Sequence, residues 1–315
     1  MTTKKRIVIT GATGQIGRPL AHRLMAAGPD VVVLSRDPGR AREILPGTAD
    51  YVAWELAETG PWASAVDGAD AVVGLAGAPF FRKWKSREEF ERVGTGGRVL
   101  ANRGLVNAMR AATQRPRVFV SASAVGYYGF RDSDEVVTEA TPAGTDGWAK
   151  GTLSWEAEVT RAEELGVRTV LVRTGIVFSR DEGMAANMIG GYRRGFGPIL
   201  LPGSQWVPWI HVEDEVGLFA FALEDERVRG GLNASAPEPV RFAEFARAMG
   251  RAAGRRVWLR VPGGVMRFSL GDVADSVIHN RRMVPRKALD LGYAFHCPTI
   301  DAALADLFPK QRASA

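Results

Sequence analysis

Near its start the sequence reads Ile7-Val8-Ile9-Thr10-Gly11-Ala12-Thr13-Gly14-Gln15-Ile16-Gly17. This order predicts a buried strand, a glycine-rich turn and the first turn of a helix. Gly11 allows a tight turn with positive φ, Gly14 lets a ligand approach the backbone, and Gly17 lets the helix pack on the strand. Because a helix N-terminus offers N–H donors and a positive dipole end, the stretch predicts a site for the bridging phosphates of a nucleotide. The residues assigned to it are Gly11, Thr13, Gly14, Gln15, Ile16 and Gly17.

The glycine spacing is Gly-x-x-Gly-x-x-Gly, one residue wider in its first gap than the common Gly-x-Gly-x-x-Gly pattern. Glycines also interrupt ordinary strand-to-helix turns, so the triplet alone leaves both interpretations open. The β-branched strand before it and the helical stretch at 22–28 after it favour the nucleotide site.

Length and composition limit the class of protein. The chain has 315 residues, of which 46% are hydrophobic, enough for one large domain or two smaller ones. No stretch reaches the roughly 20 apolar residues that cross a bilayer, so we expect no contact with a membrane. Residues 1–6 lead directly into a predicted core strand and show no signal peptide, and the single Cys297 excludes an intrachain disulfide. We therefore expect a cytoplasmic protein.

The basic charge of the chain raises the question of a nucleic-acid partner, because the formal net charge is +6. The arginines are scattered, however, and the densest cluster spans only residues 281–287. An anionic cofactor explains local positive charge more simply, so we predict no nucleic-acid partner. His22, His279 and His296 show no metal-ligand spacing, and we predict no metal site.

Short apolar runs alternate with amphipathic stretches along the first half of the chain. After the first strand, further strands are predicted at 31–35, 51–54, 69–75, 117–121 and 168–173, with long helical patterns at 88–112 and 154–165. This alternation predicts an α/β fold, a Rossmann-type doubly wound parallel sheet covered by helices on both faces. In such sheets ligands bind at the carboxyl ends of the strands.

The end of the second strand bears on the choice of cofactor. NAD-binding folds commonly place Asp or Glu there to hold the ribose 2′-hydroxyl. This chain has Ser35-Arg36-Asp37, where the Arg36 guanidinium can pair with a 2′-phosphate and Ser35 can add a hydroxyl donor. We therefore predict NADP(H) as cofactor. Two alternatives stay open, that Asp37 reaches the ribose instead and that Arg36 is an ordinary surface residue.

Two later strand ends fit the same ligand. Glu55 and Leu56 follow the third strand, where an adenine ring can rest. Leu75, Ala76 and Gly77 close the fourth strand with small residues, which lets a cofactor lie against the backbone. Either segment alone is an ordinary polar turn or small-residue loop, but both belong to the edge that carries the glycine turn.

Several motifs together resemble the extended, atypical branch of the short-chain dehydrogenase/reductase family. The chain is most similar to the members described as nucleoside-diphosphate-sugar-epimerase-like, whose activity is poorly known. The resemblance covers nearly the whole chain and is specific for the family, not for a substrate. The motifs lie at Thr10–Gly17, Leu75–Gly77, Ser121–Gly129, Arg173–Val177 and Trp209–Asp214, with a C-terminal pattern at Pro285–Phe295.

The resemblance implies a set of catalytic groups, namely a Ser or Thr after the fifth strand and a Tyr four residues before a Lys on the next helix. In that arrangement a phenolate beside an ammonium moves a proton while a nicotinamide moves a hydride. Ser123 takes the serine position and would orient the substrate oxygen. The alternative is that Ser123 caps a turn at the strand end.

The tyrosine and lysine are where this chain departs from the family. Aligned on Trp155-Glu156, they fall on Trp148 and Thr152, neither of which can do acid–base work. A register shifted by two residues makes Lys150 the lysine candidate, with an Asp four residues before it. The alternative is that Lys150 is a solvated helix residue.

Tyr127 is the second candidate for proton transfer, since it follows Ser123 in a glycine-flanked loop together with Tyr128. A phenol has a pKa of about 10, so it needs a nearby positive charge to act as a base at neutral pH. The alternative is that Tyr127 only packs and hydrogen-bonds.

His211 opens the sequence His211-Val212-Glu213-Asp214 before a predicted helix. The resemblance implies that this element is mainly structural, with Asp214 placed to cap or charge the first turn of the helix. A catalytic His211 is the open alternative.

We expect two domains. Residues 1–178, with about 207–235, form the predicted NADP-binding domain, and residues 179–206 and 236–315 form a smaller C-terminal substrate-binding or lid region. The segment 181–208 is rich in Gly and aromatic residues, as loops that wall a substrate often are. The long helices make a homodimer plausible in this fold.

Three functions are compatible with these observations. The first is an NADP(H)-dependent oxidoreductase or epimerase that acts on a small polar or sugar-like molecule, with Ser123, Tyr127 and Lys150 as candidate catalytic residues. The second is an NADP(H)-bound sensor or regulator without chemistry, which the missing Tyr and Lys favour. The third is a non-redox enzyme, a cyclase or dehydratase, that keeps the fold.

Overall fold

The chain forms two compact units. The computed structural model describes residues 4–79, 84, 86–131, 133–180, 182–265, 279 and 281–308. The first unit takes the described residues up to Gly129, Ala143–Arg173 and Val216–Leu232, and the second takes Phe130–Pro142, Thr174–Glu215 and those from Asn233 onward. Parts of the predicted substrate region, at 266–278 and 309–315, lie outside the described residues, as does Asp181.

A seven-stranded sheet with the order β12-β7-β5-β4-β1-β2-β3 organises the first unit. The pairings from β3 to β5 are parallel, and β1 lies between β2 and β4, with Ile7 opposite both Val31 and Ala71. The chain therefore reverses its direction of winding beside β1, which confirms the predicted doubly wound parallel sheet. The strands are β1 (Arg6–Thr10), β2 (Asp30–Ser35), β3 (Asp50–Ala53), β4 (Ala71–Gly74), β5 (Val118–Ala124), β7 (Arg168–Thr174) and β12 (Gly230–Ala234).

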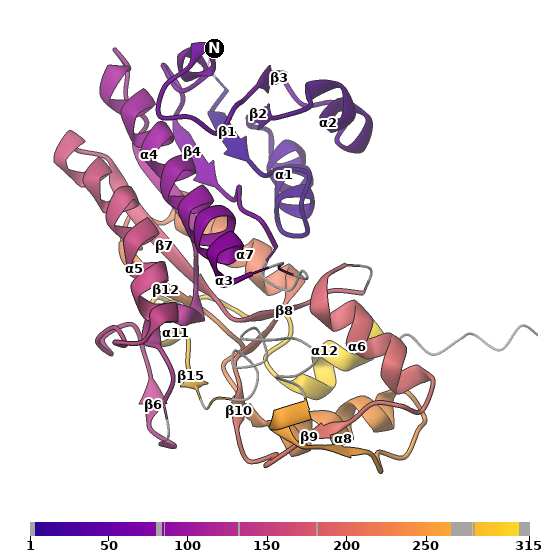
Figure 1. Cartoon of the computed structure of the whole chain (residues 1–315). Coiled ribbons are helices and arrows are strands. Elements are labelled where there is room, and N and C mark those ends of the chain that lie inside the picture. Colours follow the sequence, from indigo (N-terminus) through magenta and orange to yellow (C-terminus); the bar gives the residue numbers. More distant parts are fainter. Residues whose placement is uncertain are drawn as a thin grey trace, which may run out of the picture. The chain divides into compact units, whose positions relative to one another are not determined.

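Successive residues of each strand point to opposite faces of the sheet, and both sets are apolar. Helices therefore cover the sheet on both faces. Val8, Val72 and Phe119 belong to a buried cluster with residues of α4 and α5. The neighbours Ile7 and Ile9 are also buried but point to the opposite face, where α1 packs. Figure 1 shows α4 and α5 side by side along the sheet. The helices are α1 (Gly17–Ala27), α2 (Pro38–Ile44), α3 (Arg87–Glu89), α4 (Gly96–Ala111), α5 (Gly147–Thr160) and α7 (Val212–Glu224), with shorter turns at Pro61–Ala65, Phe90–Thr95, Val125–Tyr128 and Arg161–Leu165.

The helix predicted at 154–165 begins earlier than its apolar pattern indicates. Asp146 is its N-cap, and the side chain of Asp146 accepts a hydrogen bond from the Ala149 amide at 3.0 Å. The polar and glycine residues that open α5 hide its start from a periodicity argument, because the cap rather than the apolar stripe sets the boundary.

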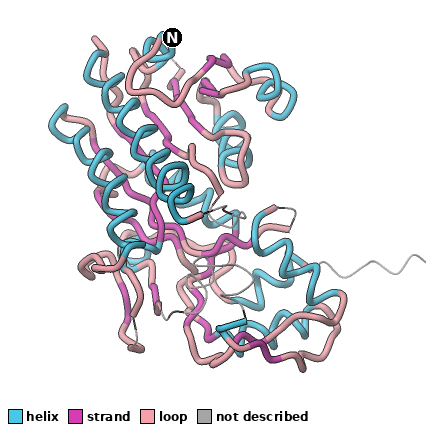
Figure 2. The backbone as a smooth tube through the Cα atoms, in the orientation of Figure 1, coloured by secondary structure: helices cyan, strands magenta, loops and turns pink. Residues whose placement is uncertain are grey.

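The second unit is built from short strand pairs and helices around its own core (Figure 2). β8, β9 and β6 pair in parallel with β11, β14 and β15, and β10 pairs antiparallel with β13. The strands are β6 (Val136–Val137), β8 (Ile176–Phe178), β9 (Ile199–Leu200), β10 (Trp206–Val207), β11 (Trp209–His211), β13 (Val240–Arg241), β14 (Arg260–Val261) and β15 (Arg282–Met283). The helices are α6 (Gly183–Arg193), α8 (Phe242–Ala252), α11 (Arg286–Asp290) and α12 (Ile300–Leu307).

The boundaries of the units differ in detail from the expected 1–178 and 207–235. Residues 174–178 and 207–215 belong to the second unit because β8 pairs with β11, and residues 130–142 belong there because β6 pairs with β15. Within the described part of the chain, no helix combines the length and the apolar character that crossing a membrane requires.

Candidate functional site

The glycine turn lies between β1 and α1, as the sequence predicts. Gly11 has φ +70°, and a Cβ there would lie 2.7 Å from the carbonyl of Leu75. A Cβ on Gly17 would lie 2.2 Å from the Gly11 carbonyl oxygen, so both positions exclude a side chain. Among the described residues a Cβ on Gly14 would meet just the Gly11 oxygen, at 3.3 Å, which leaves the outer side of the turn open. The turn therefore presents backbone rather than side chains to a ligand.

The first turn of α1 has the features of an anion-binding site. No side chain caps the helix at Ile16, and its first turn contains no acidic residue. The backbone amides and the positive end of the helix dipole therefore meet no competing carboxylate from the helix itself. Thr13, Gly14, Gln15 and Ile16 lie in this segment, in the places that the sequence predicts for phosphate contacts.

Thr10 joins the glycine turn to the end of β4. Its buried hydroxyl accepts hydrogen bonds from the amides of Leu75, at 3.2 Å, and Ala76, at 3.3 Å. Leu75, Ala76 and Gly77 therefore lie beside the turn, at the predicted edge of the sheet. The sequence analysis quoted Thr10 but assigned it no role, because a threonine at a strand end has no distinctive pattern.

Gly77 makes room for a half-buried arginine that sequence reasoning missed. A Cβ on Gly77 would lie 2.7 Å from the Arg98 guanidinium, whose nitrogens donate to the carbonyls of Gly94 and Ala78, each at 2.8 Å. Burial lowers the pKa of Arg98 to about 10. The guanidinium thus fixes the segment after β4 from the side of α4.

At the end of β2, Arg36 is exposed and Asp37 is engaged elsewhere. Asp37 is the N-cap of α2, and its carboxylate accepts a hydrogen bond from the Arg40 amide at 3.0 Å. The Ser35 hydroxyl accepts a hydrogen bond from the Asp37 amide, at 3.2 Å. One oxygen of the Asp37 carboxylate is therefore used as a helix cap, and the side chains of Arg36 and Asp37 are both exposed.

Glu55 and Leu56 follow β3 and are both exposed. Leu56 is 43% exposed, and one of its methyl groups lies beside Gly97 in the first turn of α4. An exposed leucine between two strand ends offers an apolar surface on which an aromatic ring can rest.

Ser123 lies near the carboxyl end of β5 in a buried polar network. Its hydroxyl donates to Glu156, and the two oxygens of Glu156 accept hydrogen bonds from Nε and Nη2 of Arg173, each at 3.1 Å. The side chains of Glu156 and Arg173 are each 6% exposed. Burial lowers the pKa of Arg173, but the hydrogen bonds and charge of Glu156 outweigh it and raise that pKa above its ordinary value.

The two tyrosines after Ser123 both contact Arg173. Arg173 donates to the Tyr128 hydroxyl at 3.1 Å, and its guanidinium carbon lies 3.3 Å from the centre of the Tyr127 ring. Tyr128 is fully buried, whereas Tyr127 is partly exposed. The guanidinium of Arg173 therefore lies over the face of the Tyr127 ring as a cation–π contact.

The structure brings Ser123 and Tyr127 together through Arg173, whereas among the described residues the Lys150 side chain forms no hydrogen bond with that network. Lys150 is exposed on α5, while Trp148 packs on Phe90 with ring centres 5.2 Å apart. Thr152 is buried against Gly126, where its hydroxyl donates to the Trp148 carbonyl at 2.9 Å. The positions that the family uses for Tyr and Lys thus hold packing residues.

Glu156 and Arg173 are the residues of this network that the sequence analysis did not select. Both lie inside quoted motifs, Trp155-Glu156 and Arg173–Val177. The sequence offers two indications: Glu156 is a charged residue on the apolar side of α5, and Arg173 is a charged residue within a strand. Neither indication predicts that the two side chains form an ion pair.

His211 and Asp214 lie in the second unit, and both are buried. Asp214 lies in the first turn of α7 and accepts hydrogen bonds from the amides of His296, at 2.6 Å, and Cys297, at 2.8 Å. His211 Nδ1 accepts a hydrogen bond from the Glu213 amide at 3.3 Å, and burial lowers the His211 pKa although Asp306 opposes that shift. These contacts fit the structural role that the resemblance implies for this element.

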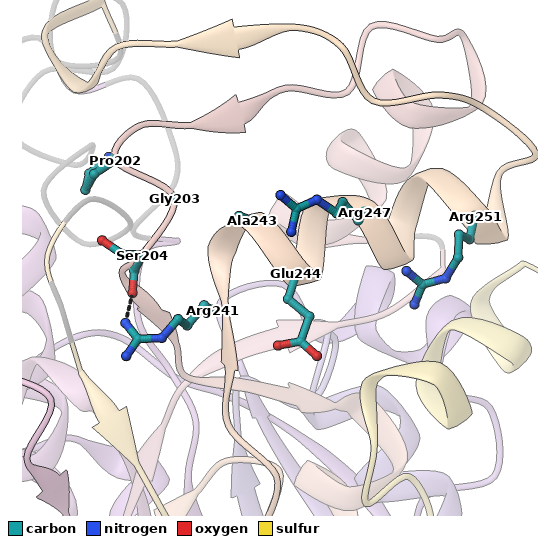
Figure 3. Close-up of a pocket in the computed structure, with 8 residues that line it drawn as sticks. All are labelled: Pro202, Gly203, Ser204, Arg241, Ala243, Glu244, Arg247 and Arg251. Atoms are coloured by element: carbon teal, nitrogen blue, oxygen red, sulfur yellow. Dashed lines mark hydrogen bonds between the residues drawn. The ribbon is translucent and has the colours of Figure 1, made fainter.

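A cavity of about 630 Å³ lies on the second unit beside α8 and shares no residue with the Ser123 network. Figure 3 shows Arg241, which donates to the Ser204 carbonyl, and Arg247 and Arg251 along the helix. A second cavity, of about 530 Å³, lies at the amino ends of β1, β4 and β5, the edge opposite the glycine turn. Over the described residues, no group of three or more His, Cys, Asp or Glu side chains could hold a metal ion.

The strand order and the glycine turn place this chain among the Rossmann-type α/β proteins. More specifically, it belongs to the NAD dependent epimerase/dehydratase family, whose model matches residues 7–233. A second model, a domain of unknown function termed DUF1731, matches residues 261–307. These matches confirm the family that the motifs resemble.

The chain is similar to relatives along most of its length. It is 36% identical to the chloroplastic Epimerase family protein SDR39U1 homolog of Arabidopsis thaliana, over 95% of this chain and 85% of that protein. It is 32% identical to the human Epimerase family protein SDR39U1, over 96% and 99%. The crystal structure of human SDR39U1 (isoform 2) with NADPH superposes with a TM-score of 0.87 at 31% identity, covering 97% of this chain and 100% of the other. A nucleoside-diphosphate sugar epimerase from Corynebacterium glutamicum gives 0.78 at 28% identity, covering 99% and 60%.

Proposed function

We propose that this protein binds NADP(H) at the glycine turn and is an oxidoreductase or epimerase that acts on a small polar or sugar-like molecule. The observation that carries the proposal is the backbone cradle at Gly11, Gly14 and Gly17, closed on one side by Leu75 and Ala76. The residues fit a dinucleotide because, within the described part of the chain, no side chain lies within 4 Å of the Cβ position of Gly14 and none caps α1. The NADPH in the human relative supports this choice of cofactor.

Arg36 favours NADP(H) over NAD(H) in this proposal. A 2′-phosphate is a doubly charged acceptor, and an exposed guanidinium at the tip of β2 can pair with it. Asp37 supports the choice indirectly, because its carboxylate caps α2 and is committed to the Arg40 amide. Glu55 and Leu56 would border the adenosine end of the cofactor, and Leu75, Ala76 and Gly77 its middle.

When bound, a nicotinamide supplies or accepts a hydride. The chain's own residues would then bind the substrate and handle the proton. Ser123 would contact the substrate oxygen from the end of β5, and Tyr127 would contact the substrate with Arg173 behind its ring. The proposal gives Lys150 no role, since its side chain is exposed and, within the part of the chain that the structure describes, forms no hydrogen bond with the network around Ser123.

The proposal is tested by titrating the purified protein with NADPH and with NADH in a calorimeter. We expect NADPH to bind with the higher affinity. Tighter binding of NADH would remove the case for Arg36, and the absence of heat with either nucleotide, for correctly folded protein, would overturn the proposal.

A second candidate function is an NADP(H)-bound sensor or regulator, and Trp148 and Thr152 favour it because they replace the acid–base pair of the family. A non-redox cyclase or dehydratase stays a third candidate. Tight NADPH binding without turnover on any carbonyl compound would favour the sensor, whereas consumption of NADPH would exclude both alternatives.

A further inference from the structure

The hydrogen-bond directions around Glu156 determine which way Ser123 can act. Both oxygens of Glu156 accept hydrogen bonds from the guanidinium of Arg173. A carboxylate has no proton of its own to donate. The Ser123 hydroxyl must therefore donate to Glu156, as the structure shows.

This hydrogen bond to Glu156 determines how Ser123 can bind a ligand. A hydroxyl has one proton, and here it points to Glu156, so Oγ presents only lone pairs elsewhere. A serine in this state accepts a hydrogen bond from a substrate hydroxyl instead of donating one to a carbonyl. The site is therefore complementary to the alcohol form of a substrate.

We propose that Ser123 and Glu156 form a proton relay that takes the place of the missing tyrosine and lysine, with Arg173 as the positioning residue. The proposal rests on the proposed function. In the oxidation of a secondary alcohol, the substrate hydroxyl gives its proton to Ser123 Oγ as Ser123 gives its own proton to Glu156.

The atoms and electrons of this step balance. The O–H bond of the substrate breaks, its electron pair forms the carbonyl π bond, and the carbinol carbon loses a hydride to oxidised NADP, the acceptor class of the proposed function. Glu156 ends the step protonated and, once the product has left, returns the proton to solvent through the Ser123 hydroxyl. In the direction of carbonyl reduction each transfer runs backwards and begins from protonated Glu156.

Burial and geometry support the relay over a purely structural ion pair. Ser123 is 7% exposed and Glu156 is 5% exposed, so water does not compete strongly for the proton path. Arg173 holds both oxygens of the carboxylate, Oε1 through Nε and Oε2 through Nη2, and is itself fixed by Tyr128 and Tyr127, which keeps Oε1 in place for Ser123. An ion pair between Glu156 and Arg173 that only stabilised the fold would not require the Ser123 hydroxyl at the end of β5.

The test compares Glu156→Gln with the matched control Glu158→Gln, two residues along the same helix, where Glu158 pairs with Arg103 and Arg161. The probes are glycerol with NADP⁺ and dihydroxyacetone with NADPH, followed by the absorbance of reduced nicotinamide. We expect Glu156→Gln and Ser123→Ala to lower kcat by roughly 10²- to 10⁴-fold, the usual contribution of acid–base catalysis. Glu158→Gln is expected to keep the wild-type kcat.

Two readouts separate a relay from a structural role. The wild type is expected to show a solvent deuterium isotope effect on glycerol oxidation, and Glu156→Gln is expected to lose it. Glu156→Asp, which keeps the carboxylate, is expected to recover part of kcat.

The outcomes distinguish the relay from the proposed function. NADPH binding with wild-type turnover in Glu156→Gln would overturn the relay and leave the proposed function standing. No binding of NADPH to the wild type would overturn the proposed function itself. Binding without turnover of either probe by the wild type would contradict the relay and favour the sensor. Unchanged NADPH affinity in Glu156→Gln shows that the variant is folded.

Discussion

At the scale of single residues, the site depends on which polar groups already form hydrogen bonds within the protein. Asp37 caps a helix, Ser123 donates to Glu156, and Glu156 accepts from Arg173. The sequence places Ser123, Arg36 and the glycines at the correct strand ends, because motifs and strand ends are local properties. It does not predict the Glu156–Arg173 pair, because the two residues come from a helix and a strand whose facing sides are set by packing.

Arg36 gives the first prediction. Arg36→Ala is expected to weaken NADPH binding by about 1.5 to 3 kcal/mol, the range for hydrogen bonds to charged groups, which is roughly ten- to a hundredfold in Kd. NADH affinity is expected to stay unchanged, since NADH has no 2′-phosphate. Calorimetric titration measures both, with Arg23→Ala on the exposed side of α1 as the control for loss of one positive charge. Equal losses of NADPH and NADH affinity would contradict the assignment.

Glu215 gives a prediction about pH. It is fully buried, and burial raises its pKa to about 8 although the Thr174 hydroxyl, which donates to Oε1 at 2.7 Å, acts in the opposite direction. A carboxyl whose folded pKa is raised binds its proton more tightly in the folded state, so its stabilising contribution is complete below the unfolded pKa and is lost as the pH rises through about 8. Glu215→Gln removes this titration.

We therefore expect Glu215→Gln to resemble the wild type near pH 5 and to be the more stable protein near pH 9, as measured by Tm. Glu224→Gln, on the exposed part of α7, is the control and is expected to show no such divergence. A difference in Tm between Glu215→Gln and wild type that is constant with pH would show that Glu215 does not titrate in this range.

At the scale of elements, the first turn of α7 fastens the C-terminal part of the second unit. The Asp214 carboxylate accepts two backbone amides from the segment before α12, and its carbonyl accepts the Tyr293 hydroxyl at 3.3 Å. The sequence predicts that Asp214 caps or charges the first turn of its helix, and Asp214 does lie in the first turn of α7. The amides that its carboxylate accepts lie more than eighty residues away, and no local pattern indicates them.

Asp214→Asn is expected to destabilise the protein by about 1.5 to 3 kcal/mol, because an amide offers a single acceptor oxygen and turns a donor toward a backbone N–H. Denaturant unfolding measures the change. Asp290→Asn, at a surface ion pair with Arg286, is the matched control and is expected to cost less than about 1 kcal/mol. Equal effects of the two substitutions would argue against a special role for Asp214.

At the scale of the whole molecule, the sequence predicts the first unit better than the second. The parallel sheet follows from apolar strands of regular spacing, which is a strong signal. The second unit is assembled from two-residue and three-residue strands, such as β6 and β15, whose pairing partners are distant along the chain. Their boundaries are decided by long-range pairing, so segments such as 130–142 fall outside any local prediction.

Ligand binding gives a prediction at this scale. A ligand that binds the folded chain at a hundred times its Kd adds about 2.7 kcal/mol of stability. We expect saturating NADPH to raise the Tm in scanning calorimetry, and we expect a smaller rise at the same NADPH concentration in Arg36→Ala. A Tm that does not respond to NADPH in the wild type would contradict the cofactor site.

The distance between Asp214 and its partners also has a consequence for biosynthesis. The amides that satisfy this carboxylate follow it by 82 and 83 residues. During translation the start of α7 therefore leaves the ribosome long before its partners exist, and a negative charge destined for the interior has to stay in water meanwhile. The contacts that satisfy Asp214 can therefore form only after Cys297 has emerged.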